Sequence, residues 1–294
     1  MRNVFNSMFA AVLVMGICGL SSCTSTPAGR SGKPVLLAVS FGTSFDESRA
    51  LTIGAIEKAL ADAYPEYEVR RAFTSQIVID VIKERGGEQI DNVKEAFDKL
   101  VRDGVKDVVV QSTHLMEGEE YHEMLDTIKP FEKKFNSVRY GKPLLPSESY
   151  DKDYDDLIKA LIAETAQYAA PDTAIAYMGH GTEAESNQDY EILARKLVEQ
   201  GYSNYLIGTV EAEPTLDDVI DQATKLGVKK IVLLPLMIVA GDHANNDMAG
   251  DEDDSWKSIL QGKGFTVTTV LKGLGQYPGV QQVFVRHAGE AISK

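Results

Sequence analysis

The sequence predicts an α/β fold of two similar halves, each a parallel sheet flanked by helices, with a cleft between the halves. From residue 33 onward, short and continuous apolar runs alternate with amphipathic helical stretches, a pattern typical of parallel strands buried on both faces. The scheme also repeats along the chain. Phe41-Gly42-Thr43 aligns with His180-Gly181-Thr182. Further on, Gly104-Val105-Lys106 aligns with Gly227-Val228-Lys229, and each of these opens a predicted strand.

The first half is predicted to span residues 34–145. Its first element is an apolar strand at 34–40, followed by a helix at 46–62 for which Ser44 is the expected N-cap and Glu47 completes a capping box. Alternating patterns then predict strands at 67–73 and 107–113 and helices at 76–85, 88–102 and 119–135. The segment 142–149, which contains two prolines, is typical of a linker.

The second half is predicted to span residues 146–294 and repeats the alternation. β-branched and apolar runs predict strands at 173–178, 204–209, 229–234 and 265–271. Amphipathic stretches predict helices at 185–200 and 215–226, a helix that begins at Trp256, and a closing helix at 279–293.

Residues 1–28 differ from the rest and have the pattern of a secretory signal peptide. Arg2 precedes the apolar run Met8–Leu20, which is too short for a bilayer span of about 18 residues or more, and small residues follow it. Leu20-Ser21-Ser22-Cys23 supports a second interpretation, a lipoprotein leader that ends before Cys23 and leaves a lipid anchor there. Either leader predicts a periplasmic protein whose mature chain has no transmembrane span.

Composition excludes several functions. With 44 acidic and 30 basic residues, the chain has a formal net charge of −14, which disfavours binding to nucleic acid phosphates. Both cysteines, Cys18 and Cys23, lie in the leader, so the body has no cysteine-based metal site. The absence of a GxxxxGK[ST] loop argues against ATP, and the absence of GxGxxG after the first strand argues against NAD.

Three predicted strand ends in the second half carry metal-binding residue types. His180 follows the strand that ends at Met178, Glu211 follows the next strand, and His243 lies beyond the third. Because ligands bind outside the carboxyl ends of parallel strands, we expect these side chains to converge. Two imidazoles and a carboxylate suit a first-row divalent ion and leave coordination positions open. The alternative is that His180 caps a helix and His243 lies in a surface loop.

The corresponding positions in the first half are Phe41, Ser75 and Glu120, so the metal site is expected only in the second half. Acidic residues 117–120 favour a helix N-terminus, and a catalytic role for one of them is the alternative. His114 ends its strand and either packs there or faces the cleft. His122 is predicted to be a surface residue, with axial ligation of haem, or of a metal at a subunit interface, as the alternative. His287 is expected on the surface.

Four segments together resemble the anaerobic-pathway sirohydrochlorin cobaltochelatases, which are ATP-independent relatives of ferrochelatase. These segments are Leu37–Ser44, Thr113–Tyr121, Met178–Thr182 and Pro235–Met248. The resemblance implies two α/β domains around a cleft and insertion of Co²⁺ into a tetrapyrrole, with Fe²⁺ as the alternative ion. It further implies that His180 and His243 are active-site histidines and that Glu117 is the catalytic acid.

Two further functions stay open from the sequence. The first is an exported haem, tetrapyrrole or metal-ion carrier on a chelatase fold, for which His122 would be the haem ligand. The second is a ferrochelatase that acts on protoporphyrin. We also expect a homo-oligomer, and basic residues at the rim of the cleft to hold the substrate carboxylates.

Overall fold

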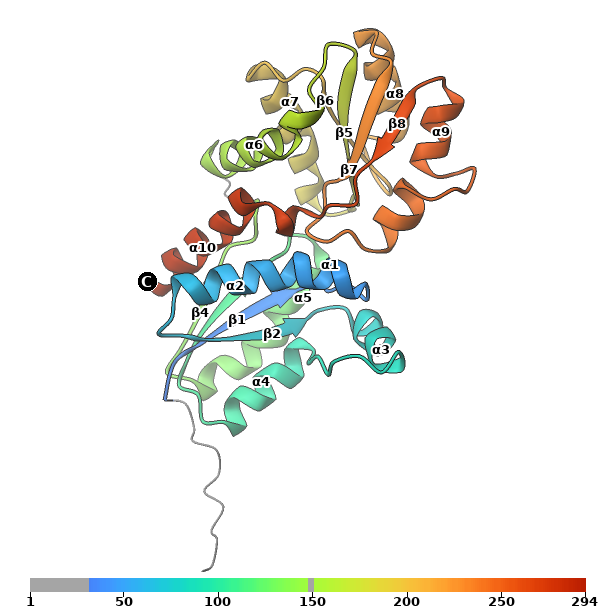
Figure 1. Cartoon of the computed structure of the whole chain (residues 1–294). Coiled ribbons are helices and arrows are strands. Elements are labelled where there is room, and N and C mark those ends of the chain that lie inside the picture. Colours follow the sequence, from blue (N-terminus) through green and yellow to red (C-terminus); the bar gives the residue numbers. More distant parts are fainter. Residues whose placement is uncertain (1–31, 148–150) are drawn as a thin grey trace, which may run out of the picture. The chain divides into compact units, whose positions relative to one another are not determined.

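A computed structural model describes residues 32–147 and 151–294, and these contain two four-stranded parallel sheets (Figure 1). The strand order is β2-β1-β3-β4 in the first sheet and β6-β5-β7-β8 in the second, so the two sheets have the same topology. The prediction of two similar α/β halves is confirmed. The predicted leader, with its cleavage site and Cys23, lies outside the described residues.

The first half alternates strands and helices in chain order. Its elements are β1 Val35–Ser40, α1 Asp46–Leu51, α2 Ile53–Ala63, β2 Glu68–Phe73, α3 Gln76–Glu84, α4 Val93–Arg102, β3 Asp107–Ser112, α5 Glu119–Ile128 and β4 Ser137–Gly141. The second half begins with a helix and follows the same scheme. Its elements are α6 Asp151–Thr165, β5 Thr173–Gly179, α7 Gln188–Glu199, β6 Tyr205–Thr209, α8 Leu216–Leu226, β7 Lys230–Pro235, α9 Trp256–Gly262, β8 Thr266–Thr269 and α10 Pro278–Ile292.

The central strands divide their side chains between two cores, because successive residues of a strand point to opposite faces. In β1, Leu36 joins an apolar cluster with β5, α6 and α10, whereas Leu37 joins a second cluster with α4 and α5. In β5, Tyr177 belongs to the first cluster and Met178 to a third, which packs under α8 and α9. One apolar core therefore includes residues of both sheets.

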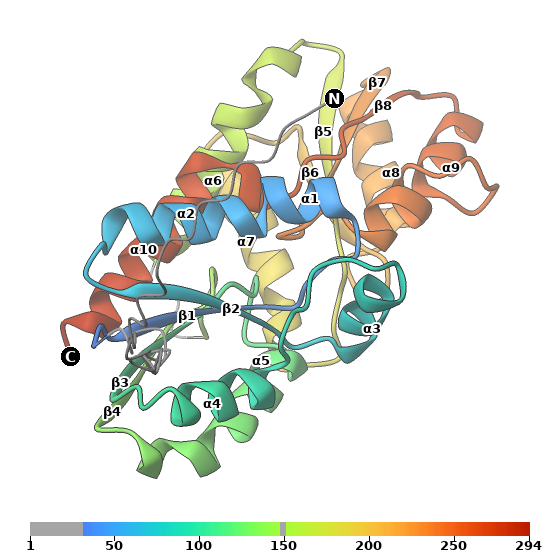
Figure 2. The same cartoon turned by 60° about the horizontal axis from the view of Figure 1, so that its bottom comes forward.

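The last helix, α10, packs across the boundary predicted at residue 145. It contacts β3, β4 and α2 of the first half as well as α6, and Figures 1 and 2 show it alongside α2. Arg139 of β4 donates to the carbonyl of Ile292 over 2.8 Å, which ties the end of α10 to the first sheet. Because α10 packs against elements of both halves, it is part of both. No helix in the described ranges is long and apolar enough to cross a membrane.

Several predicted element boundaries are wrong. The helix expected at 46–62 is interrupted at Thr52, and its N-cap is Phe45, without a capping side chain, in place of Ser44. Helix α4 begins at Val93, five residues later than expected, where Asn92 and Glu95 form a capping box. The helix expected to reach residue 135 changes to a 3₁₀ segment after Ile128, where a proline removes a backbone donor.

Candidate metal centre and substrate pocket

A cavity of 330 Å³ lies at the carboxyl ends of the strands and has walls from both halves. The loop after β1 contributes Phe41, and the loop after β3 contributes His114. From the second half, His180 enters from the loop after β5 and His243 from the segment after β7. The pocket therefore lies where ligands bind in parallel α/β sheets.

The loops after β1 and β5 turn in the same way. Gly42 and Gly181 both have positive φ, 107° and 89°, a conformation that glycine adopts without strain. A Cβ at Gly181 would approach the backbone nitrogen of Ala212 to 2.8 Å, so a side chain there would displace the loop after β6. In the first half, the buried Arg49 guanidinium donates to the Thr43 carbonyl over 3.0 Å and supports the loop from behind.

His180, Glu211 and His243 come together in the second half, as the strand-end positions predict. One ligand atom from each lies within 4.8 Å of the other two, so a single ion could contact all three side chains. The two imidazole rings are 4.7 Å apart between centroids and nearly perpendicular. Glu211 is the most open of the three, with 55% of its side chain exposed. Three protein ligands leave positions for water or substrate.

Each histidine of this cluster has its Nδ1 engaged. Nδ1 of His180 lies 2.7 Å from the carbonyl oxygen of Gly181, and Nδ1 of His243 lies 2.7 Å from Oδ2 of Asp247. An Nδ1–H donated to these acceptors leaves the lone pair of Nε2 for a metal ion. Asp247 follows His243 by four residues, and residues Ala244–Met248 form a π-helical turn, a feature that is frequent at functional sites.

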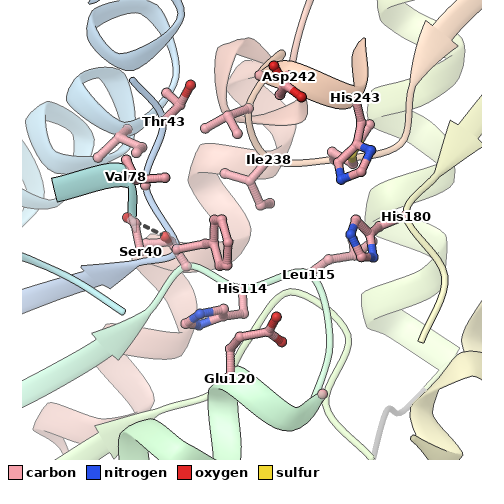
Figure 3. A pocket seen from close by; sticks show the side chains of 18 of the residues that line it. Ser40, Thr43, Val78, His114, Leu115, Glu120, His180, Ile238, Asp242 and His243 are labelled. Atoms are coloured by element: carbon pink, nitrogen blue, oxygen red, sulfur yellow. Dashed lines mark hydrogen bonds between the residues drawn. The ribbon is translucent and has the colours of Figure 1, made fainter. Parts of the chain in front are cut away.

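The first half contributes a different pair of polar side chains, His114 and Glu120. Figure 3 shows them on the side of the pocket across from His180 and His243. Nδ1 of His114 lies 2.8 Å from the hydroxyl of Ser112, and burial lowers the pKa of His114 to about 4. His114 is therefore uncharged at neutral pH.

Glu117, the residue matched to the catalytic acid by resemblance, does not line this pocket. Its carboxylate accepts a hydrogen bond from Ser147, and the acid that lines the cavity is Glu120, three residues later in the first turn of α5. The sequence motif contains three acids within four residues. Of these, only Glu120 lines the pocket.

The two remaining histidines lie apart from the pocket. His122 is exposed on α5, where its ring contacts Tyr121 edge-on, and haem ligation by His122 stays a prediction. His287 is 1% exposed, so its predicted surface position is wrong. Its Nε2 lies 3.2 Å from Oδ1 of Asp153, a partner 134 residues earlier in the chain.

No lysine or arginine is found among the described residues that line the pocket, and the basic residues expected at the rim of the cleft stay a prediction. The wall is mostly apolar, with Phe45, Val78, Leu115 and Ile238 among its members. Arg85 approaches the lining at one point, where its guanidinium donates to the carbonyl of Ser44 over 3.4 Å. Such a pocket suits an apolar ring whose charged substituents remain in solvent.

Comparisons with known proteins show similarity to cobaltochelatases over most of the chain. The chain is 36% identical to the sirohydrochlorin cobaltochelatase of Salmonella typhimurium, across 89% of this chain and 97% of that protein. It is 32% identical to sirohydrochlorin cobaltochelatase CbiKC of Nitratidesulfovibrio vulgaris, across 89% and 91%.

Solved structures support the fold. SirB from Bacillus subtilis with Fe³⁺ matches with a TM-score of 0.61 at 15% identity, covering 88% of this chain and 95% of that one. DR2241 from Deinococcus radiodurans, described as similar to chelatases, matches with a TM-score of 0.56 at 15% identity, over 88% of this chain and 55% of that one. Residues 34–293 match the family described as cobalt chelatase (CbiK), and the chain belongs to this family.

Proposed function

We propose that this protein inserts Co²⁺ into sirohydrochlorin without ATP. The observation that carries the proposal is the cluster of His180, Glu211 and His243 beside a largely apolar pocket. The names of the two relatives that cover most of the chain support cobalt as the ion and sirohydrochlorin as the ring.

In this proposal, the second half holds the ion before it enters the ring. A ring nitrogen of His180, a ring nitrogen of His243 and a Glu211 oxygen replace part of the water shell of Co²⁺. The exposed side of Glu211 leaves room for the remaining waters. An ion held by three imidazole and carboxylate ligands is released more readily than an ion in a closed protein site. It can therefore pass to the pyrrole nitrogens as they become available.

Insertion requires two N–H protons to leave the macrocycle, one from each of two pyrrole nitrogens. Glu120 is the proposed acceptor, because its carboxylate lines the pocket and is also open to solvent, so each proton can continue to water. His114, which stays neutral, adds no positive charge that would repel the incoming ion. The balance is one Co²⁺ bound and two protons released for each ring.

The leader predicted for residues 1–28 adds a further proposal, that this chemistry takes place in the periplasm. The test is cell fractionation of the full chain, together with the mass of its mature N-terminus. A mature chain that begins at Gly29 supports simple cleavage. A lipid-modified Cys23 supports the anchor, and an intact leader in the cytoplasm contradicts export.

The function itself is tested by a spectroscopic insertion assay with two rings and two ions, in the absence of ATP. Sirohydrochlorin and protoporphyrin are each offered Co²⁺ and Fe²⁺ under anaerobic conditions. The proposal predicts the highest kcat/KM with sirohydrochlorin and Co²⁺. A preference for protoporphyrin and Fe²⁺ would instead support ferrochelatase, and no insertion with any pair would contradict a chelatase.

A further inference from the structure

The backbone hydrogen bonds show that Phe41 and His180 occupy the same position in the two halves. The Phe41 carbonyl accepts from the amide of Ser75 over 3.2 Å, and the His180 carbonyl accepts from the amide of Glu211 over 2.9 Å. One residue earlier in each half, the carbonyls of Ser40 and Gly179 accept from the next strand's loop in the same way. The pair Phe41 and Ser75 therefore corresponds to the pair His180 and Glu211.

The side chains at these equivalent positions differ in chemistry. In the first half, the Ser75 hydroxyl accepts from the amide of Val78 as the N-cap of α3, and Phe41 has no metal-binding atom. In the second half, His180 and Glu211 belong to the metal cluster. The pocket thus has metal ligands on one of two equivalent loops and an aromatic ring on the other.

Phe41 is an exposed apolar residue that lies inside the pocket. Its side chain is 44% exposed although it lines the cavity. The other exposed large apolar side chains of the described residues do not line this cavity; they are Leu51, Ile77, Val101, Val198, Leu226 and Leu271. Scattered exposed apolar residues are common on protein surfaces, but one inside an apolar pocket has a surface that a ligand can cover.

We propose that Phe41 positions the substrate by contacting the face of the tetrapyrrole that is turned away from His180 and His243. This inference rests on the proposed function, because it requires a flat conjugated ring in the pocket. Aromatic rings stack in offset or edge-to-face geometry with centroids about 4.5–7 Å apart, so a phenyl ring is a suitable support for a macrocycle. Phe41 then determines how tightly the ring binds, whereas His180 determines how tightly the ion binds.

In this arrangement the metal ion can reach the macrocycle from one face only. With Phe41 and Ser75 in place of a histidine and a glutamate, the loops after β1 and β2 offer no second ion site at the equivalent position. Co²⁺ is presented to only one face of the ring, and the opposite face rests on an apolar side chain. Movement of the ring away from the ion is thereby limited.

The test compares Phe41→Ala and Phe41→Tyr with Leu226→Ala, a control whose side chain is 42% exposed on α8 outside the pocket. Two binding titrations are measured without turnover, sirohydrochlorin without metal and Co²⁺ without ring. We expect Phe41→Ala to weaken sirohydrochlorin binding about tenfold, which corresponds to the stacking contribution of one aromatic contact. Phe41→Tyr should retain it within about threefold, and Leu226→Ala should match the wild type.

Co²⁺ affinity should be unchanged in all three variants. Phe41→Ala with wild-type sirohydrochlorin affinity, or with Co²⁺ affinity lowered as much as ring affinity, would overturn the inference. Thermal melting checks that each variant is folded. If Phe41→Ala is not folded, a loss of Co²⁺ affinity in Phe41→Tyr equal to its loss of sirohydrochlorin affinity would still overturn the inference. Insertion by the wild type in the same preparation tests the proposed function separately, because the two titrations need no turnover.

Discussion

Nδ1 of His243 lies 2.7 Å from Oδ2 of Asp247, four residues further along a π-helical turn. A carboxylate in this place orients the imidazole and holds the proton on Nδ1, which leaves the Nε2 lone pair for a metal ion. Asp247 is therefore expected to act on the metal ion through His243, without contacting the ion itself.

Asp247→Asn should raise the KM for Co²⁺ about 10–100-fold, because an amide can turn its NH₂ toward Nδ1 and favour the wrong imidazole tautomer. The KM for sirohydrochlorin should stay within about twofold. The matched control is Asp251→Asn, an exposed carboxylate paired with Lys257 and in contact with neither histidine. Equal changes in both KM values would argue for a general structural effect.

Glu120 and Glu117 provide a direct test of which acid accepts the pyrrole protons. Glu120→Gln should lower kcat about 100-fold or more, because its carboxylate lines the pocket and its amide cannot take a proton. Glu117→Gln should retain kcat within a few-fold, since that side chain is held by Ser147 outside the lining. Co²⁺ binding should be unaffected by either change. The reverse order of the two kcat values would restore Glu117 as the acid.

Asp189 predicts an unusual dependence of stability on pH. It is 5% exposed, Tyr154 donates to its Oδ1 over 2.7 Å, and burial raises its pKa to about 6. Between about pH 4 and pH 6 the folded protein holds a proton that the unfolded chain releases, so this residue's contribution to stability falls as pH rises. Asp189→Asn should therefore raise the melting temperature at pH 7 by about 2–4 °C and lose this advantage near pH 4.

Asp153 serves as a control, because its contribution to stability is expected to depend on pH in the opposite direction. Burial raises its pKa, but hydrogen bonds from His287 and Arg286 outweigh that effect and leave the pKa below its ordinary value. The ionised form therefore stabilises the fold above about pH 4, and this contribution disappears as pH falls. Asp153→Asn should lower the melting temperature at pH 7. The same sign of change for both variants at pH 7 would contradict the assignment.

The sequence predicted the central strands well because their signal is local. Strands β1 and β5 are largely apolar runs and β3 contains the run Val108–Val110, and each lies within one or two residues of its predicted position. Strand β4 was missed, because Ser137–Gly141 is a short edge strand whose residues are mostly half-buried and partly polar. The position of β4 depends on its pairing with β3, and a local sequence pattern does not indicate that pairing.

The convergence of the three candidate metal ligands was predicted for a related reason. In parallel sheets the strand ends share one edge, so His180, Glu211 and His243 could be brought together from their order along the chain. Residues that depend on distant partners were not predicted. His287 is buried on α10, where its Nε2 lies 3.2 Å from Oδ1 of Asp153 on α6, and which of Glu117 and Glu120 lines the pocket could not be read from the motif.

The most direct test of the account is a Co²⁺ titration of the wild type and of His180→Ala, followed by visible absorption and paired with the sirohydrochlorin insertion assay. The wild type should bind one Co²⁺ per chain with imidazole-type ligand-field bands and should insert it. His180→Ala should lose the bands, and its rate of insertion should fall about 100-fold or more, while sirohydrochlorin still binds. Undiminished insertion by His180→Ala would contradict the assignment of the metal site to the second half.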